Sequence, residues 1–204
     1  NGIDEKTANK IYDEMTDFAK YAFNKSHAAA YAVVSYQTAW LKYYYPVEYM
    51  AALMTSVIDN PGKVAEYIYS CRQMGIKILP PDINHGYSSF SVDNGSIRYG
   101  LAAIKSIGRP VIKEIVAERK ANGEFKNLKD FIERMSGKDI NKRTIENFIK
   151  SGAFDELGGT RKQFMVIYVQ ILDQVNREKK NSMTGQMSLF DIVGEEQKSE
   201  FDIP

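Results

Sequence analysis

Helical periodicity runs through most of this 204-residue chain and is interrupted once. Apolar residues recur every three to four positions before residue 75 and again after residue 100, as in amphipathic α-helices. Between these regions, two short alternating segments flank Asp93, Asn94 and Gly95, a strong signal for a tight β-hairpin turn. Past residue 180 the periodicity ends. The sequence therefore predicts a mainly α fold with a small β-hairpin and a flexible tail.

Proline, asparagine and glycine mark the helix boundaries. Pro46 suits the first position of a helix, because that position needs no backbone N–H. Asn60 and Pro61 repeat the pattern as N-cap and first residue of the next helix, and Gly75 ends it. Residues 27–45 are apolar nearly all round, which predicts a helix buried on most sides.

The N-terminal end of this apolar helix carries positive charge where a helix dipole disfavours it. Lys25 lies there with His27, and either Asn24 or Ser26 can cap the helix. A docked polyphosphate would reverse the sign, because backbone N–H groups, a hydroxyl and an ammonium converge. A solvated lysine beside a capping serine explains the same residues equally well.

A second candidate site is the turn that precedes Pro110. A helix is expected to end near Lys105, and Gly108 lies where the turn needs a residue tolerant of positive φ and close backbone approach. Outward N–H groups at the start of the next helix favour a phosphate oxygen. This pattern is typical of a helix-hairpin-helix, a motif that contacts the phosphate backbone of DNA and not the base edges. The residues predicted to contact DNA are Lys105, Ser106, Ile107, Gly108, Arg109 and Lys113.

An ordinary helical corner is the alternative, since the usual pattern has two glycines and Ser106 replaces the first. A second, less specific hairpin is expected at Ser151 and Gly152, and its turn is either a second DNA contact or purely structural. The basic residues near it are Lys142, Arg143, Lys150, Arg161 and Lys162.

Charge is unevenly distributed along the chain. Residues 98–180 hold 18 Lys and Arg against 11 Asp and Glu, a net charge of +7. Residues 181–204 hold one against five, a net charge of −4. The middle segment suits a polyanion such as nucleic acid, although a solvated surface accounts for the same excess.

Several classes of function find no support in the sequence. No apolar run is long enough to span a bilayer, and no secretory signal is recognised, so a cytoplasmic protein without membrane contact is expected. One cysteine and two histidines leave no metal site of the usual kinds. No Asp-x-Asp pair and no phosphate-cradling Gly-rich loop occur, so no catalytic or metal-binding residue is assigned and no cofactor is expected.

The chain resembles the alpha subunit of the C family of bacterial replicative DNA polymerases over nearly its whole length. The segments that carry the resemblance, in order, are "YAFNKSHAAAYAVVSYQTAWLKYYYPVEYMAALMTS", "MGIKILPPDIN", "IRYGLAAIKSIG", "FIKSGAFDELG" and "GQMSLFD". The resemblance implies the C-terminal part of the fingers over 1–80 and a β-hairpin connector over 81–100. It further implies a tandem helix-hairpin-helix domain over 101–180 and a tail over 181–204.

The resemblance also assigns roles. Asn24, Lys25, Ser26 and His27 become contacts to the incoming nucleotide, and the basic hairpin binds duplex primer-template DNA. The parent enzyme, a DNA-directed DNA polymerase, would hold its divalent metal, Mg²⁺, through palm carboxylates that lie outside this segment. The segment alone is therefore expected to be inactive.

A short apolar cluster in the tail matches the pattern of sliding-clamp-binding peptides in bacteria. The matching residues are Gln186, Met187, Ser188, Leu189 and Phe190. Leucine and phenylalanine gain free energy in a concave pocket on another protein, and glutamine fixes the register by hydrogen bonds. The resemblance therefore implies the β sliding clamp as a partner.

Two other interpretations compete with a polymerase segment. One is a stand-alone helix-hairpin-helix DNA-binding or repair protein, which gives no account of residues 23–45. The other is a structural helical protein that binds a partner through its tail.

Overall fold

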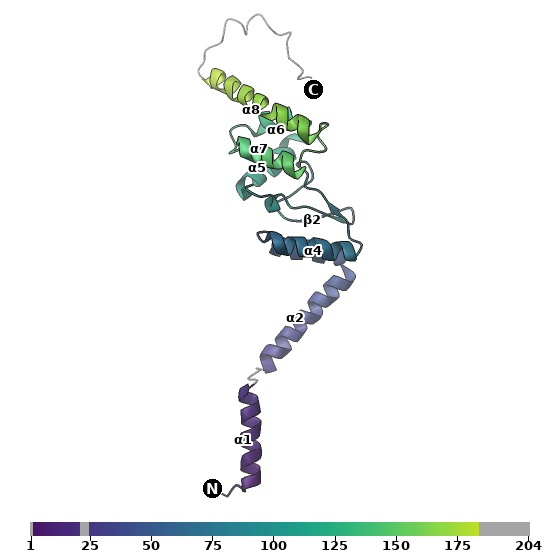
Figure 1. Ribbon diagram of the computed structural model, residues 1–204, viewed down its shortest axis with the longest axis vertical. Coiled ribbons are helices and arrows are strands. Elements are labelled where there is room, and N and C mark those ends of the chain that lie inside the picture. The colour runs from purple at the N-terminus through teal and green to yellow at the C-terminus, as the bar shows by residue number, and fades with distance from the viewer. Residues whose placement is uncertain (1, 21–24, 184–204) are drawn as a thin grey trace, which may run out of the picture. The chain divides into compact units, whose positions relative to one another are not determined.

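Helices make up most of the computed structural model, which describes residues 2–20 and 25–183 (Figure 1). The predicted mainly α class is confirmed. The chain forms two compact units, one up to Pro46 and one from Val47 onward. No described helix is long and apolar enough to cross a membrane. The predicted clamp motif, 186–190, lies outside the described residues.

The first unit contains two helices among its described residues, α1 (Glu5–Lys20) and α2 (Lys25–Tyr44). The carboxylate of Asp4 caps α1 by accepting hydrogen bonds from the backbone N–H of Thr7 at 2.9 Å and from its hydroxyl at 2.7 Å. The two residues that form this cap, Asp4 and Thr7, lie in the same four-residue stretch, so the start of α1 is specified locally.

The predicted burial of residues 27–45 is wrong for this structure, because no described residue of α2 is buried. Aromatic rings pack against one another instead, with the Trp40 ring centroid 4.8 Å from that of Tyr44 and 5.7 Å from that of Tyr45, the residue that follows α2. An apolar surface around a whole helix is buried only where other elements surround it. Among the described residues of this unit, only α1 accompanies α2.

The second unit begins with α3 (Pro46–Ser56) and α4 (Pro61–Gln73), which start at the predicted prolines. Asn60 caps α4, and its side-chain oxygen accepts a hydrogen bond from the N–H of Lys63 at 3.1 Å. These helices bury one apolar core against the sheet. Its most buried members are Met50, Met54, Cys71 and Ile97.

The sheet has three short strands: β1 (Ile78–Leu79), β2 (Ser91–Asp93) and β3 (Ser96–Arg98). The central strand, β3, pairs antiparallel with β2 and parallel with β1. Asn94 and Gly95 have φ values of 48° and 75°, the left-handed pair that the predicted two-residue turn requires. The sequence did not predict β1.

A larger helical core follows. Its elements are η1 (Leu101–Ala103, a 3₁₀ helix), α5 (Arg109–Asn122), α6 (Leu128–Met135), α7 (Lys142–Ser151) and α8 (Arg161–Met183). Within this unit, the sheet lies between α4 and the group formed by α5 to α8 (Figure 1). The core is rich in aromatic rings packed mainly edge to face. Its buried phenylalanines are Phe125, Phe131, Phe148, Phe154 and Phe164.

Candidate nucleic-acid interface

The first hairpin, residues 101–109, starts with a shorter helix than the sequence predicts. The expected helix ending near Lys105 is replaced by η1, which ends at Ala103. The backbone N–H groups of Ile104 and Ile107 each donate to the carbonyl three residues earlier, at 3.2 and 3.3 Å, which is the 3₁₀ pattern. The side chains of Leu101, Ile104 and Ile107 are all buried.

The positive φ in this turn falls on Ser106 and not on Gly108. Ser106 has φ of +65°, whereas Gly108 has φ of −74°, so the conformational role assigned to Gly108 is wrong. A side chain in the left-handed region costs about 1–2 kcal/mol. Two contacts from α7 hold the turn in place. Asn147 donates to the carbonyl of Lys105 at 3.1 Å, and Arg143 donates to the hydroxyl oxygen of Ser106 at 3.1 Å.

The start of α5 leaves backbone donors open, as the sequence predicts. Gly108 is the N-cap and supplies no side-chain hydrogen bond. Among the described residues, none accepts a hydrogen bond from the backbone N–H of Gly108 or Arg109, and both residues are exposed. The remaining helices from α4 to α8 are capped by a side-chain oxygen of Asn60, Asn127, Asn141 or Thr160. An oxyanion from outside the chain therefore has access to the N-terminus of α5.

The three cations predicted to contact DNA surround this turn. Lys105 and Lys113 are exposed, and neither has an acidic partner among the described residues. Arg109 instead forms an ion pair with Asp59 across 2.9 Å. Both side chains of this pair are exposed, so it contributes about 1 kcal/mol at most. A phosphate that binds Arg109 would therefore have to displace Asp59.

The second hairpin joins α7 to α8 and is closed by its own side chains. Gly152 ends α7 in the left-handed conformation, with φ of 86°. The guanidinium of Arg161 covers Gly152 and donates to the carboxylate of Asp155, with Nε 2.9 Å from Oδ1. The same guanidinium donates to the carbonyl of Lys150 at 3.3 Å. The hydrogen bond that Arg161 donates to Asp155 raises the pKa of Arg161.

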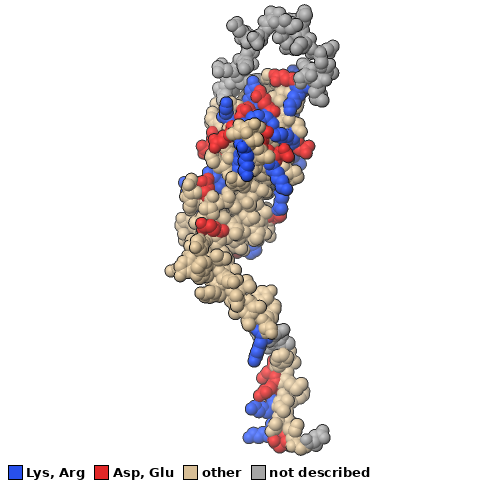
Figure 2. Space-filling view, turned by 180° about the vertical axis from the view of Figure 1, so that it is seen from behind, with Lys and Arg blue, Asp and Glu red and all other residues tan. Residues whose placement is uncertain are grey.

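The lysines near the second hairpin are also largely paired with acids. Lys142 lies 3.1 Å from Asp173, and Lys150 contacts Glu146 one turn earlier in α7. Lys162 has no acidic partner among the described residues. On the face shown in Figure 2, basic and acidic residues are interspersed over the helical part of the second unit. The second hairpin is therefore close to electrically balanced.

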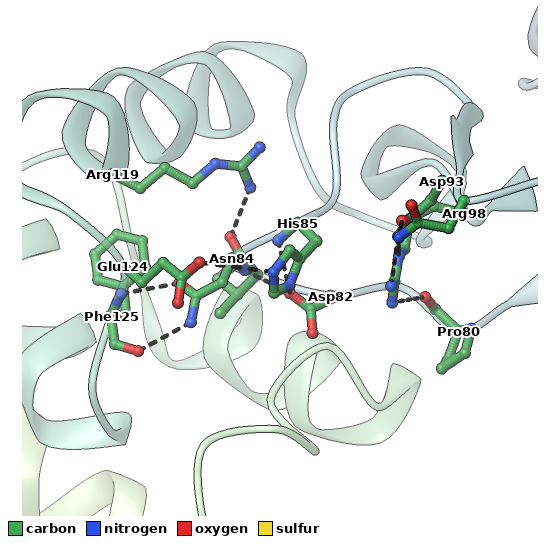
Figure 3. Close-up of polar contacts among 11 residues, drawn as sticks. Pro80, Asp82, Asn84, His85, Asp93, Arg98, Arg119, Glu124 and Phe125 are labelled. Atoms are coloured by element: carbon green, nitrogen blue, oxygen red, sulfur yellow. Dashed lines mark hydrogen bonds and ion pairs between the residues drawn. The ribbon is translucent and has the colours of Figure 1, made fainter.

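A loop after β1 forms the support of the first hairpin and was missed by sequence reasoning (Figure 3). The carboxylate of Asp82 is buried and accepts from the backbone N–H groups of Asn84 and His85, at 2.7 Å each. It also lies 3.1 Å from Nδ1 of His85. The side-chain amide of Asn84 pairs with the backbone N–H and carbonyl of Phe125, both at 2.9 Å. Pro80, Pro81 and Asp82 are local turn signals, but they do not indicate the distant partner Phe125.

The same loop fastens α5 to the second hairpin. Arg119 of α5 is buried, donates to the carbonyl of Ile83 at 2.8 Å, and lies 4.8 Å above the ring of Tyr87. The N–H of Ile83 donates to the carbonyl of Ala153 at 2.9 Å. Burial is the main cause that lowers the pKa of Arg119. These contacts fix α5, and with it the first hairpin, relative to the turn before α8.

The predicted nucleotide contacts fall in the first unit. Lys25, Ser26 and His27 occupy the first turn of α2, which has no acidic residue, and Asn24 lies outside the described residues. The rings of His27 and Tyr31 are 4.3 Å apart. No cluster of three or more metal-ligating side chains occurs within residues 2–20 and 25–183.

Comparison with known proteins identifies the hairpin region. Residues 75–164 match a family model described as "Helix-hairpin-helix motif". Over 197 residues, 96% of this chain, the sequence is 46% identical to "DNA polymerase III subunit alpha" of Escherichia coli strain K12. The chain is therefore similar, over nearly its whole length, to a segment of DNA polymerase III alpha subunits. It spans 17% of the length of that relative.

Other DNA polymerase III alpha subunits match over the same extent. The subunit from Vibrio cholerae is 45% identical over 95% of this chain and 17% of its own length. The subunit from Saccharopolyspora erythraea is 42% identical over 97% of this chain and 17% of its own length. The similarity to DNA polymerase III alpha therefore includes both units and extends well beyond the helix-hairpin-helix region.

Proposed function

We propose that this chain is a segment of a replicative DNA polymerase alpha subunit that binds duplex DNA by its phosphate backbone, without reading sequence. The observation that carries the proposal is the uncapped N-terminus of α5, with its exposed Gly108 and Arg109 donors beside Lys105 and Lys113. The helix-hairpin-helix match spans this turn. Backbone donors and lysines at a helix N-terminus suit a phosphate oxygen and make no contact with base edges.

Salt dependence tests this proposal. Affinity for a labelled duplex should fall steeply between about 50 and 200 mM salt, because each neutralised phosphate adds about 0.9 to the slope of log K against log salt. The double change Lys105→Gln and Lys113→Gln should weaken binding and reduce the slope by about 1–2. Fluorescence anisotropy measures both quantities.

The matched control is the double change Lys77→Gln and Lys126→Gln, which removes the same charge from two exposed lysines outside the hairpin. The control should keep nearly the whole wild-type slope. Equal losses in the two variants would show that general charge, and not the hairpin, governs binding. Wild-type binding that does not respond to salt would exclude the phosphate contacts altogether.

The catalytic role belongs to the larger protein. We infer that the parent carries out template-directed DNA synthesis in the cytoplasm, since the matched relatives are named as DNA polymerase III alpha. Its Mg²⁺ would be held outside this segment. Lys25, Ser26 and His27, together with Asn24, would contact the incoming nucleotide at the start of α2. In the parent enzyme, Lys25→Ala should raise KM for nucleotide or lower kcat, and unchanged values would remove the assignment.

We further infer that residues 186–190 bind the sliding clamp and so keep the primer terminus near the polymerase. Changing Leu189 and Phe190 together to alanine should abolish binding of this chain to the clamp in surface plasmon resonance, because both apolar anchors are lost. Duplex DNA affinity should not change. Clamp binding that survives this double change would contradict the assignment.

The stand-alone DNA-binding protein is the weaker candidate. It explains the match over residues 75–164 but gives no reason for the similarity that continues through the first unit.

A further inference from the structure

Arg143 belongs to the second hairpin by sequence but reaches the first hairpin in space. It lies near the start of α7, and its guanidinium donates to the hydroxyl oxygen of Ser106 at 3.1 Å. Asn147, one turn further along the same helix, donates to the carbonyl of Lys105. The exposed face of α7 is therefore joined to the tip of the turn that precedes α5.

The partner of Arg143 sets it apart from three of its basic neighbours, while Lys162 also lacks an acidic partner among the described residues. Lys142, Lys150 and Arg161 each pair with a carboxylate, on Asp173, Glu146 and Asp155 respectively. Arg143 is exposed, and among the described residues its one hydrogen-bond partner is the neutral Ser106. Its positive charge is therefore not compensated, whereas the other three charges are.

A paired cation and an unpaired one differ in what they offer a phosphate. A lysine beside a carboxylate brings a negative charge close to the incoming phosphate, which cancels much of the attraction. A guanidinium held by a neutral hydroxyl keeps its full charge. Only one nitrogen of Arg143, Nη2, is used by Ser106, so further N–H donors remain for a two-point contact with a phosphate.

We propose that Arg143 is a phosphate contact of the first hairpin, and that Lys142, Lys150 and Arg161 stabilise the fold instead of binding DNA. This inference rests on the duplex binding proposed above. Ser106 acts as a positioning residue, because its hydroxyl holds the guanidinium beside the open N-terminus of α5. The two hairpins then differ in their role in DNA binding. The first hairpin binds the phosphate backbone, and α7 of the second hairpin contributes Arg143 to that site.

The test compares single variants of the whole chain on one labelled duplex. Arg143→Gln should lower the affinity about five- to tenfold near 100 mM salt and reduce the salt slope by about 0.9. Arg143→Lys should restore most of the slope, because the charge is kept, while affinity recovers only in part without the planar fork. Lys142→Gln and Lys150→Gln are the matched controls on the same helix. Each should change affinity less than about twofold.

Several outcomes are decisive. If Lys142→Gln or Lys150→Gln lowered DNA affinity as much as Arg143→Gln, the proposed difference between the two hairpins would be wrong. A wild-type slope in Arg143→Gln, together with a reduced slope in Lys105→Gln, would overturn the inference while leaving duplex binding intact. Wild-type slopes in both would show that duplex binding does not use the first hairpin, and no binding of the wild-type chain would overturn duplex binding itself. Thermal unfolding of each variant separates a folding defect from a lost contact.

Discussion

At the scale of single residues, Ser106 shows how a side chain replaces a glycine in a tight turn. It adopts φ of +65°, where glycine has no steric penalty, and it offers an oxygen that glycine lacks. Arg143 uses that oxygen. The positive φ of Ser106 costs some stability, and its hydroxyl oxygen in turn holds the Arg143 guanidinium beside the start of α5.

Two substitutions that both remove the Ser106 hydroxyl isolate the cost of its positive φ. Ser106→Val should be less stable than Ser106→Gly by about 1–2 kcal/mol, because a β-branched side chain suits the left-handed region poorly. Thermal unfolding of the two variants measures the difference. If valine proved as stable as glycine, the turn would have left the positive-φ conformation, contrary to the structure.

Sequence reasoning found this turn but misplaced its special residue. Gly108 and Pro110 indicated a turn followed by a helix, and α5 does start there. The positive φ fell on Ser106 because two side chains of α7 hold it there. Contacts from nearly 40 residues away leave no local pattern, so the choice between the two positions was not predictable.

At the scale of elements, Glu118 joins α5 to α6 and the residues after it. Its carboxylate accepts hydrogen bonds from the Arg134 guanidinium at 3.1 Å, from the Lys138 ammonium and from the Asn122 amide. These donors, Lys138 first, lower the pKa of Glu118 from 4.5 to about 2. The carboxylate is mostly buried, with 12% of its side chain exposed.

A lowered pKa predicts a specific dependence of stability on pH. Glu118 stabilises the fold fully above about pH 4.5, its unfolded pKa, and loses this contribution as pH falls toward 2. Glu118→Gln should cost about 2 kcal/mol at pH 7 and make unfolding less sensitive to acid across that window. Urea unfolding at several pH values measures both effects. A loss that is equally large at pH 7 and pH 2 would rule out the charged carboxylate as the cause.

Elements whose signals are local were predictable, and those that depend on distant partners were not. Asn60 and Pro61 specify the start of α4 within a few residues, and Asn94 with Gly95 specifies the hairpin turn. Strand β1 has two residues and exists only because β3 pairs with it in parallel. Its sequence carries too little periodicity to be recognised.

At the scale of the whole molecule, the basic excess of residues 98–180 overstated the surface available to DNA. Many of those cations are neutralised by acids within the second unit, including Lys138, Lys142, Lys150 and Arg161. Composition counts charges but not their partners. Within the described residues, Lys105, Lys113 and Arg143 at the first hairpin have no acidic partner, whereas of the other cations named at the second hairpin only Lys162 lacks one.

We expect DNA to meet the second unit at the first hairpin, and amide NMR of the chain with a short duplex checks this expectation residue by residue. Adding duplex to the labelled chain should shift the backbone N–H signals of Gly108 and Arg109 and the side-chain Nε–H of Arg143. The signals of Gly152 to Gly159 should change little. Shifts centred on the second hairpin, or none at Gly108 and Arg109, would contradict the claim that the first hairpin holds the phosphate backbone.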